Sequence, residues 1–134
     1  MKAVRTKWHI AIASLLLLPA LIQLAAAAER MAVLDIWRAF QDDLEAARER
    51  YVDEMMTLVG VVVDTGMSRF MTPTVSLSEQ AGGEVRAICV LPRADFARMY
   101  DYKPGQEAAF VGRIYSASGN DRPVIVKECR AAEL

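Results

Sequence analysis

The chain contains 134 residues, of which 54% are hydrophobic and 25% are charged, and its formal net charge is −1. This length suffices for one small domain, and the near-neutral charge excludes the strong basic excess that non-specific binding of nucleic acid requires. The sequence contains no internal repeat, low-complexity stretch or long charge run that would indicate a second domain.

The N-terminal residues have the three parts of a secretory signal peptide. A basic start, MKAVRTK, precedes an almost wholly apolar run over residues 10–28, which ends in alanines. Ala26 and Ala28 meet the small-x-small requirement, so the sequence predicts a signal peptide over residues 1–28 that is cleaved after Ala28. The protein is then expected to be periplasmic or secreted. The alternative is an uncleaved inner-membrane anchor, because 19 residues can just cross a bilayer, and membrane contact would then be through this leader.

Cleavage would change both the charge and the available chemistry. The leader carries three of the 16 basic residues and none of the 17 acids, so residues 29–134 have a net charge of −4. It also carries His9, the only histidine, and its loss would exclude Ser–His and Cys–His catalysis and the commonest transition-metal ligand. Two cysteines do not complete a structural zinc site, which needs four ligands. We therefore expect no metal site and no cofactor.

Residues 29–52 have the spacing of an amphipathic helix. One apolar stripe recurs at three- and four-residue steps and consists of Val33, Trp37, Phe40, Leu44, Ala47 and Tyr51. The opposite face is charged. We expect this helix to pack on its own domain, and the alternative is a docking site for a partner helix.

From residue 53 to residue 134 the pattern is mainly β. Three strand-like runs come first, MMTLVGVVVDTG, PTVSLS and EVRAICVLP, and the helical run RADFARMYDY follows them. Two further strands, QEAAFVGRIYSA and RPVIVKECRA, end the chain. Three strands, a helix and two strands are the order of the OB-fold, a five-stranded Greek-key barrel. The predicted fold class is therefore mainly β with α, an OB-fold barrel over residues 53–134 preceded by one amphipathic helix.

Several short motifs sharpen this prediction. They are LVGVVVD with Gly60, TVSLS, a third strand that contains a cysteine (VRAICVL), PGQ, FVGRI with Gly112, and KECRA. In these motifs the chain from about Tyr51 to Leu134 resembles the tRNA anticodon-binding-like OB-fold family of small exported bacterial proteins. The resemblance implies the fold of nucleic-acid-binding proteins, but it implies no RNA activity for exported members.

Cys89 and Cys129 are the only cysteines, and they lie in the third and the last predicted strands. Export, the even count and strands that a barrel can bring together favour a structural disulfide between them. Closing a loop of about 40 residues would contribute about 4 kcal/mol in the chain-entropy model. Two buried free thiols and a redox-active pair are the alternatives, although redox pairs usually lie close in sequence.

The candidate ligand face follows from where OB-folds usually bind, on strands 2 and 3 and on the loops joining strands 1–2 and 4–5. These places carry Arg69, Phe70, Arg86, Tyr115 and Arg122. Arginine beside an aromatic ring can stack a base and meet a phosphate, or it can anchor a peptide. The same residue types also occur on surfaces that bind nothing.

No catalytic group is predicted. Adjacent acids such as Asp42 and Asp43 point in different directions on a helix, so they form no acid–base pair. The sequence favours an exported, non-catalytic binding or interaction module of the bacterial envelope, with another envelope protein as its partner. The alternative is an OB-fold that binds an oligonucleotide or an oligosaccharide through the same face. A membrane-anchored module and an enzyme are less favoured.

Overall fold

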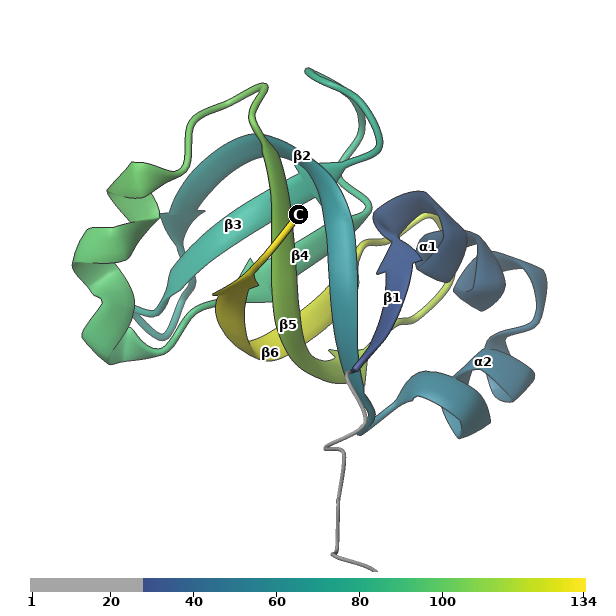
Figure 1. Cartoon of the computed structure of the whole chain (residues 1–134). Coiled ribbons are helices and arrows are strands. Elements are labelled where there is room, and N and C mark those ends of the chain that lie inside the picture. Colours follow the sequence, from purple (N-terminus) through teal and green to yellow (C-terminus); the bar gives the residue numbers. More distant parts are fainter. Residues whose placement is uncertain (1–27) are drawn as a thin grey trace, which may run out of the picture.

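The structure is a computed structural model that describes residues 28–134, in which strands form a barrel flanked by helices (Figure 1). In chain order the elements are β1 (Glu29–Ala32), α1 (Val33–Asp42), α2 (Leu44–Tyr51), β2 (Met55–Met67), β3 (Pro73–Ser78), β4 (Ala87–Val90), the 3-10 helix η1 (Arg93–Asp101), β5 (Glu107–Ser116) and β6 (Val124–Ala132). The helices α1 and α2 lie on one side of the barrel and η1 on the other.

The strand order is β1-β2-β3-β4-β6-β5, and β2 also pairs with β5, which closes the barrel. The long strand β2 reaches both partners, because residues 55–61 pair with β5 and residues 61–67 with β3. A register shift between Val62 and Asp64 marks the change of partner. β4 and β6 are parallel, and the other pairs among β2 to β6 are antiparallel. The order of these five strands, with η1 after the third, confirms the predicted OB-fold.

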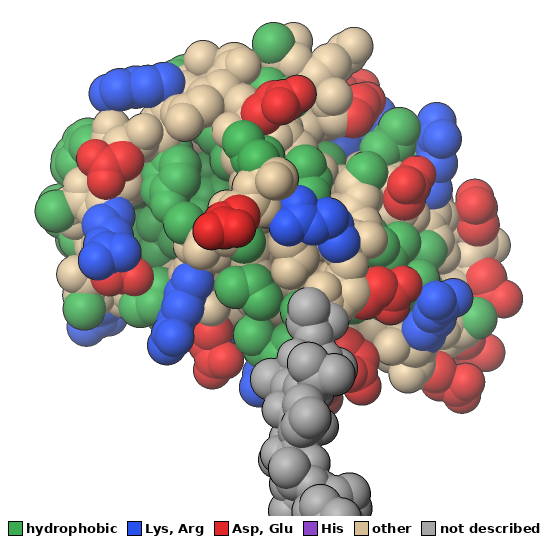
Figure 2. Space-filling view, viewed as in Figure 1, with side chains coloured by type: hydrophobic (Ala, Val, Ile, Leu, Met, Phe, Trp, Pro, Cys, Tyr) green, Lys and Arg blue, Asp and Glu red, His purple; other side chains and the backbone are tan. Residues whose placement is uncertain are grey.

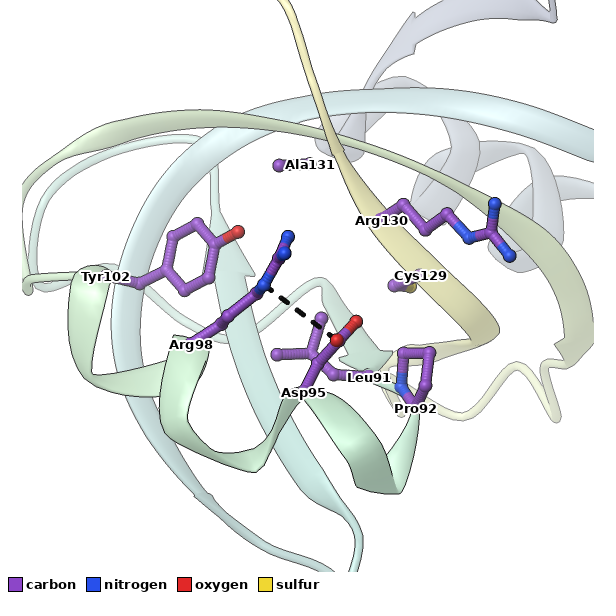
Figure 3. Close-up of a pocket in the computed structure, with 8 residues that line it drawn as sticks. All are labelled: Leu91, Pro92, Asp95, Arg98, Tyr102, Cys129, Arg130 and Ala131. Atoms are coloured by element: carbon purple, nitrogen blue, oxygen red, sulfur yellow. Dashed lines mark ion pairs between the residues drawn. The ribbon is translucent and has the colours of Figure 1, made fainter.

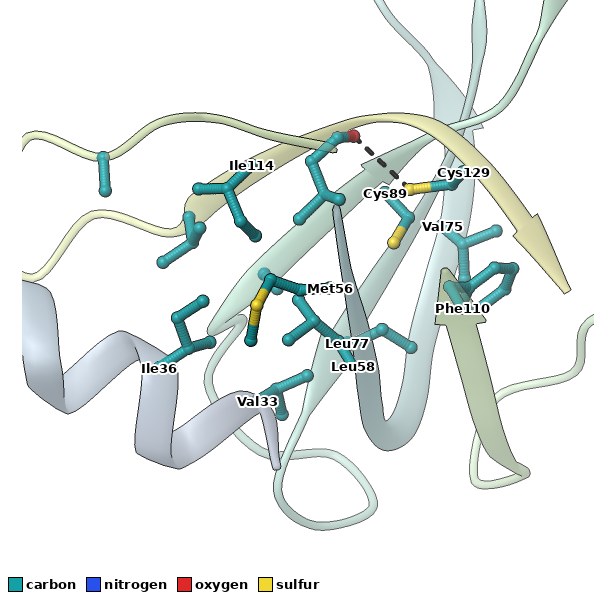
Figure 4. Close-up of a cluster of buried hydrophobic side chains, with 14 of the residues drawn as sticks. Val33, Ile36, Met56, Leu58, Val75, Leu77, Cys89, Phe110, Ile114 and Cys129 are labelled. Carbon is teal, nitrogen blue, oxygen red and sulfur yellow. Dashed lines mark hydrogen bonds between the residues drawn. The ribbon is translucent and has the colours of Figure 1, made fainter. Parts of the chain in front are cut away.

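The core fills the barrel and continues under α1 (Figure 4). Alternation along the strands produces it, since every second residue of β3 and β4 points inward. The largest completely buried side chains come from both helix and strands and include Phe40, Phe110, Ile36, Leu58, Leu77 and Ile114. Each such side chain stabilises the fold by about 1.5–3 kcal/mol relative to an exposed one.

The prediction of one continuous helix over residues 29–52 is wrong, because this range forms β1, α1 and α2. Residues 29–32 form β1 instead, because they pair in parallel with residues 56–59 of β2. Asp43 then interrupts the helix with an extended backbone, and its Oδ1 accepts a hydrogen bond from Ala46 N (3.1 Å) to begin α2. The apolar stripe does pack on its own domain, as expected: Val33, Phe40, Ala47 and Tyr51 are buried.

The predicted disulfide is not formed in the structure. Cys89 and Cys129 are free thiols, and both are completely buried in the core (Figure 4). The Cys129 thiol donates a hydrogen bond to the carbonyl oxygen of Val126 (3.5 Å). Both side chains pack there as small hydrophobic residues do.

The predicted signal peptide, residues 1–28, lies outside the described residues except for Ala28. None of the helices formed by residues 28–134 is long and apolar enough to cross a membrane.

Candidate ligand-binding groove

A groove of about 950 Å³ runs over the outer face of β3, β4 and β6. Its floor consists of Thr74, Ser76, Ile88, Val90 and Ile125, and its rim carries Met67, Arg69, Phe70, Tyr115, Lys127 and Glu128. We call this site the groove.

The floor faces outward because its residues alternate with core residues. Ile88 and Val90 stand on either side of the buried Cys89, and Ile125 stands between two buried valines of β6. All three are apolar and only partly covered. An outward-facing sheet surface that is apolar and concave is a mark of a binding site.

The loop over residues 68–72 holds one rim of the groove in a fixed turn. The Ser68 hydroxyl is hydrogen-bonded to that of Thr72 and accepts from the backbone N of Phe70 (3.2 Å) and of Thr72 (3.3 Å). Arg93 of η1 donates from Nη2 to the carbonyl oxygen of Phe70 (2.9 Å). The Phe70 side chain is nevertheless 79% exposed. The aromatic ring of Phe70 is therefore exposed to solvent, although its backbone is held by hydrogen bonds.

Tyr115 presents a second aromatic ring beside a positive charge. Its ring is 52% exposed, and Lys127 Nζ lies 3.5 Å from the ring centroid. Glu128 is the one acid that lines the groove, and Arg113 Nε lies 3.5 Å from its Oε2. Because this acid is partnered, Arg69 and Lys127 give the groove a positive character.

The structure separates the five residues of the predicted ligand face. Arg69, Phe70 and Tyr115 lie together on the groove, whereas Arg86 and Arg122 do not line it. The Arg86 guanidinium instead lies 4.1 Å from the centroid of a Trp37 ring, whose Nε1 donates to the carbonyl oxygen of Arg122 (3.2 Å). Trp37 of α1 therefore contacts both the residue before β4, Arg86, and the loop between β5 and β6, which carries Arg122.

Sequence reasoning missed the apolar floor and Lys127. The floor did leave a signal, because the run AICV in β4 is apolar at every position and not only at alternate ones. This pattern is typical of strands that are covered on both faces, and in this structure the outer face of β4 is the floor of the groove.

Arg86 forms an ion-pair network with Glu79 and Glu84. Its Nε and Nη2 donate to the two carboxylate oxygens of Glu79 (3.0 and 3.3 Å), and its Nη1 donates to Glu84 (3.2 Å). The hydrogen bonds from Arg86 hold the pKa of Glu79 at about 2, below its ordinary value of 4.5.

The depressed pKa of Glu79 predicts a pH dependence of stability. A carboxyl whose pKa is lower in the folded state stabilises the fold above pH 4.5, and the contribution is lost as the pH falls toward 2. Because solvent screens the Glu79–Arg86 pair, we expect the free energy of unfolding to fall by about 1 kcal/mol from this group on acidification. Urea unfolding of the wild type and of Glu79→Gln at pH 6 and at about pH 2.5 measures it. The difference in free energy of unfolding between the wild type and Glu79→Gln should be smaller at the acidic pH. A difference that does not change with pH would contradict the lowered pKa of Glu79.

A second cavity, of about 500 Å³, lies between η1 and β6 (Figure 3). Arg98 and Asp95 of η1 face it and form an ion pair (3.9 Å), and the Tyr102 hydroxyl also points into this space. Burial raises the pKa of Tyr102. This cavity is smaller than the groove, and its lining carries the Asp95–Arg98 ion pair together with Arg130. Within residues 28–134, no three His, Cys, Asp or Glu side chains gather as metal ligands would.

Comparison with known proteins agrees with this architecture. The tRNA_anti-like family model matches residues 5–130. The chain belongs to the tRNA_anti-like family. The resemblance seen in the sequence motifs is thereby confirmed.

Among solved structures, this tRNA_anti-like chain is similar to a proposed nucleic acid-binding lipoprotein from Klebsiella pneumoniae subsp. pneumoniae MGH 78578. The TM-score is 0.65 at 17% sequence identity, over 81% of this chain and 95% of that one, which shows a shared fold. It also matches OBody AM3L09 bound to hen egg-white lysozyme, with a TM-score of 0.46, 14% identity and coverage of 61% and 84%. No curated protein matches the chain.

Proposed function

We propose that this tRNA_anti-like protein is an exported, non-catalytic binding module that holds a segment of another envelope protein in the groove. The apolar floor beneath two exposed aromatic rings is the observation that carries this proposal. Exposed aromatic residues set around an apolar pocket are the usual anchors of protein–protein contacts.

The charges favour a protein segment that carries an acid. Arg69 and Lys127 offer two cations beside the apolar floor, enough for one or two carboxylates. A nucleic-acid strand needs a longer basic track, and residues 29–134 have a net charge of −4. Figure 2 shows acidic side chains gathered over α1 and α2, which would repel a polyanion that extended onto that side.

The available side chains support a non-catalytic role. Residues 28–134 contain no histidine. Burial raises the pKa of Cys89 well above its ordinary value, so its thiol is a poor nucleophile. Export is supported by the signal-like leader, and the name of the Klebsiella relative describes a lipoprotein, which is an exported class.

Site-specific photocrosslinking in living cells tests the proposal. The photoreactive amino acid p-benzoylphenylalanine replaces Phe70 in the full chain, and irradiation should give an adduct in the periplasmic fraction that protease degrades and nuclease leaves intact. Tyr100 on η1 is the matched control position, because it is 59% exposed and lies outside the groove. Replacement there should give no such adduct. In the Phe70-substituted protein, Tyr115→Ala should lower the adduct yield several-fold, since hot-spot anchors each contribute about 2 kcal/mol or more.

Binding of a single-stranded oligonucleotide is the alternative. It is favoured by the Lys127 ammonium over the Tyr115 ring and by Arg69, the sequence neighbour of Phe70 on the same rim. A nuclease-sensitive adduct from position 70 would establish this alternative and reject the protein partner. The absence of any adduct from position 70 would reject both.

A further inference from the structure

The cavity between η1 and β6 has the composition of a second binding site. Its volume of about 500 Å³ is that of a pocket for a small molecule. η1 supplies Asp95 and Arg98 to the lining, and β6 supplies Arg130. Leu91 and Pro92 line both this cavity and the groove, so the two sites are neighbours. None of the charged residues of the cavity lines the groove, so the two sites can be tested independently.

The charged side chains of the cavity do not balance one another. Arg98 Nε lies 3.9 Å from Asp95 Oδ1, which is a long ion pair. Arg130 forms no ion pair with any residue between 28 and 134. Two arginines and one aspartate leave the lining with a net charge of +1. One singly charged anion would neutralise this charge, and a guanidinium matches a carboxylate through two parallel hydrogen bonds.

Tyr102 adds a hydrogen-bond donor to the two cations. Its hydroxyl points into the cavity beside Arg98 (Figure 3). Phe110 of the core holds the tyrosine ring in place, with 5.0 Å between the two ring centroids. Burial raises the pKa of Tyr102, so the hydroxyl keeps its proton at neutral pH and can donate it to an anion.

The rest of the lining is largely apolar. Pro92 is only partly covered and Ala131 is exposed, and both present carbon atoms to the cavity. An inorganic ion would leave this surface in contact with water. A ligand with an apolar body would cover it and gain hydrophobic free energy.

We propose that this cavity binds a small organic molecule that carries a single carboxylate on an apolar body. The carboxylate lies between Arg98 and Arg130 and accepts a hydrogen bond from the Tyr102 hydroxyl. The apolar body rests on Pro92 and its apolar neighbours. A second negative charge on the ligand would meet Asp95 with no cation left to balance it. The proposal does not depend on what the groove binds.

Titration of the isotope-labelled protein with benzoate, followed by two-dimensional NMR, tests the site. Benzoate carries one carboxylate on an apolar ring. We expect saturable shifts in the amides of η1 and of residues 129–131, with a Kd of about 1 mM for so small a probe. Benzamide, its uncharged analogue, should bind at least about tenfold more weakly, because it loses the charge-assisted hydrogen bonds. No saturable shift with benzoate, or equal binding of benzamide, would overturn the proposal.

Matched variants separate this site from a general attraction of anions. Arg98→Gln and Arg130→Gln should each weaken benzoate binding about tenfold. Tyr102→Phe keeps the ring on Phe110 and should weaken it several-fold. Arg38→Gln is the control, because Arg38 is exposed on α1, outside the cavity, and its Kd should equal that of the wild type. An equal loss in all three arginine variants would overturn the proposal.

Two phosphates test the class of ligand. Inorganic phosphate lacks an apolar body, and phenyl phosphate carries a second negative charge on a similar ring. Both should bind more weakly than benzoate, because the first leaves the apolar lining uncovered and the second is repelled by Asp95. Tighter binding of either phosphate than of benzoate would overturn the assignment of a monocarboxylate.

Discussion

Phe40→Ala is expected to destabilise the protein by about 3–5 kcal/mol, the cost of removing a buried phenylalanine and leaving a cavity. The Phe40 ring is completely buried between α1 and the barrel, and its centroid lies 6.1 Å from that of Tyr51. Small domains have a total stability of about 5–15 kcal/mol, so the loss would be a large share of it. The midpoint of urea unfolding, followed by circular dichroism, measures this change.

The control for this substitution is Phe70→Ala, which removes the same side chain from an exposed position. Its stability should lie within about 0.5 kcal/mol of the wild type. If Phe40→Ala does not fold, Phe40→Leu keeps much of the apolar volume and should give a smaller, measurable loss. A loss below about 1 kcal/mol for Phe40→Ala would show that α1 is not part of the cooperative unit.

Gly112→Ala is expected to cost about 1–3 kcal/mol by overpacking, although alanine is the smallest side chain that can be added. A Cβ at this position of β5 would lie 2.7 Å from Val126 Cγ1, 2.9 Å from the backbone oxygen of Lys127 and 3.0 Å from Cys129 Sγ. The backbone oxygen belongs to the neighbouring strand β6, so relief of the contact requires the strands to separate. Urea unfolding again measures the effect.

Gly66→Ala provides the matched control in the same barrel. At that position the nearest atom to a new Cβ is Thr74 Oγ1 at 3.8 Å, an ordinary contact. Its stability should be unchanged or higher by up to about 0.5 kcal/mol, because alanine has less conformational freedom in the unfolded chain. Equal effects of the two substitutions would contradict the close approach of β5 and β6 at Gly112.

Most of the barrel was predictable because strand patterns are local. Val75 and Leu77 alternate with polar neighbours, and a turn or a proline follows the second, third and fourth predicted strands, so neighbouring residues already indicate the elements and their buried faces. The helix was predicted less well. Its apolar stripe is continuous across Asp43, whereas the break depends on a hydrogen bond from Ala46 and on β1 pairing with β2.

The candidate site was predictable only in part, because contacts between residues that are distant in the sequence leave no local pattern. Position in the OB-fold pointed to Arg69, Phe70 and Tyr115, and the structure places all three on the groove. Arg86 was equally plausible in the sequence, but Trp37 covers its guanidinium and Glu79 and Glu84 neutralise it. No local pattern reveals such partners, because Trp37 lies far from Arg86 in the chain.

The sequence by itself determined the order of the strands and the OB-fold, since these follow from side-chain alternation and turn residues that act over a few positions. Only the tertiary structure decided which charges are free, where the first helix breaks and which apolar strand residues remain outside. It also decided that both cysteines are buried in the core as free thiols. Each of these depends on residues that are distant in the chain and meet only when the barrel closes.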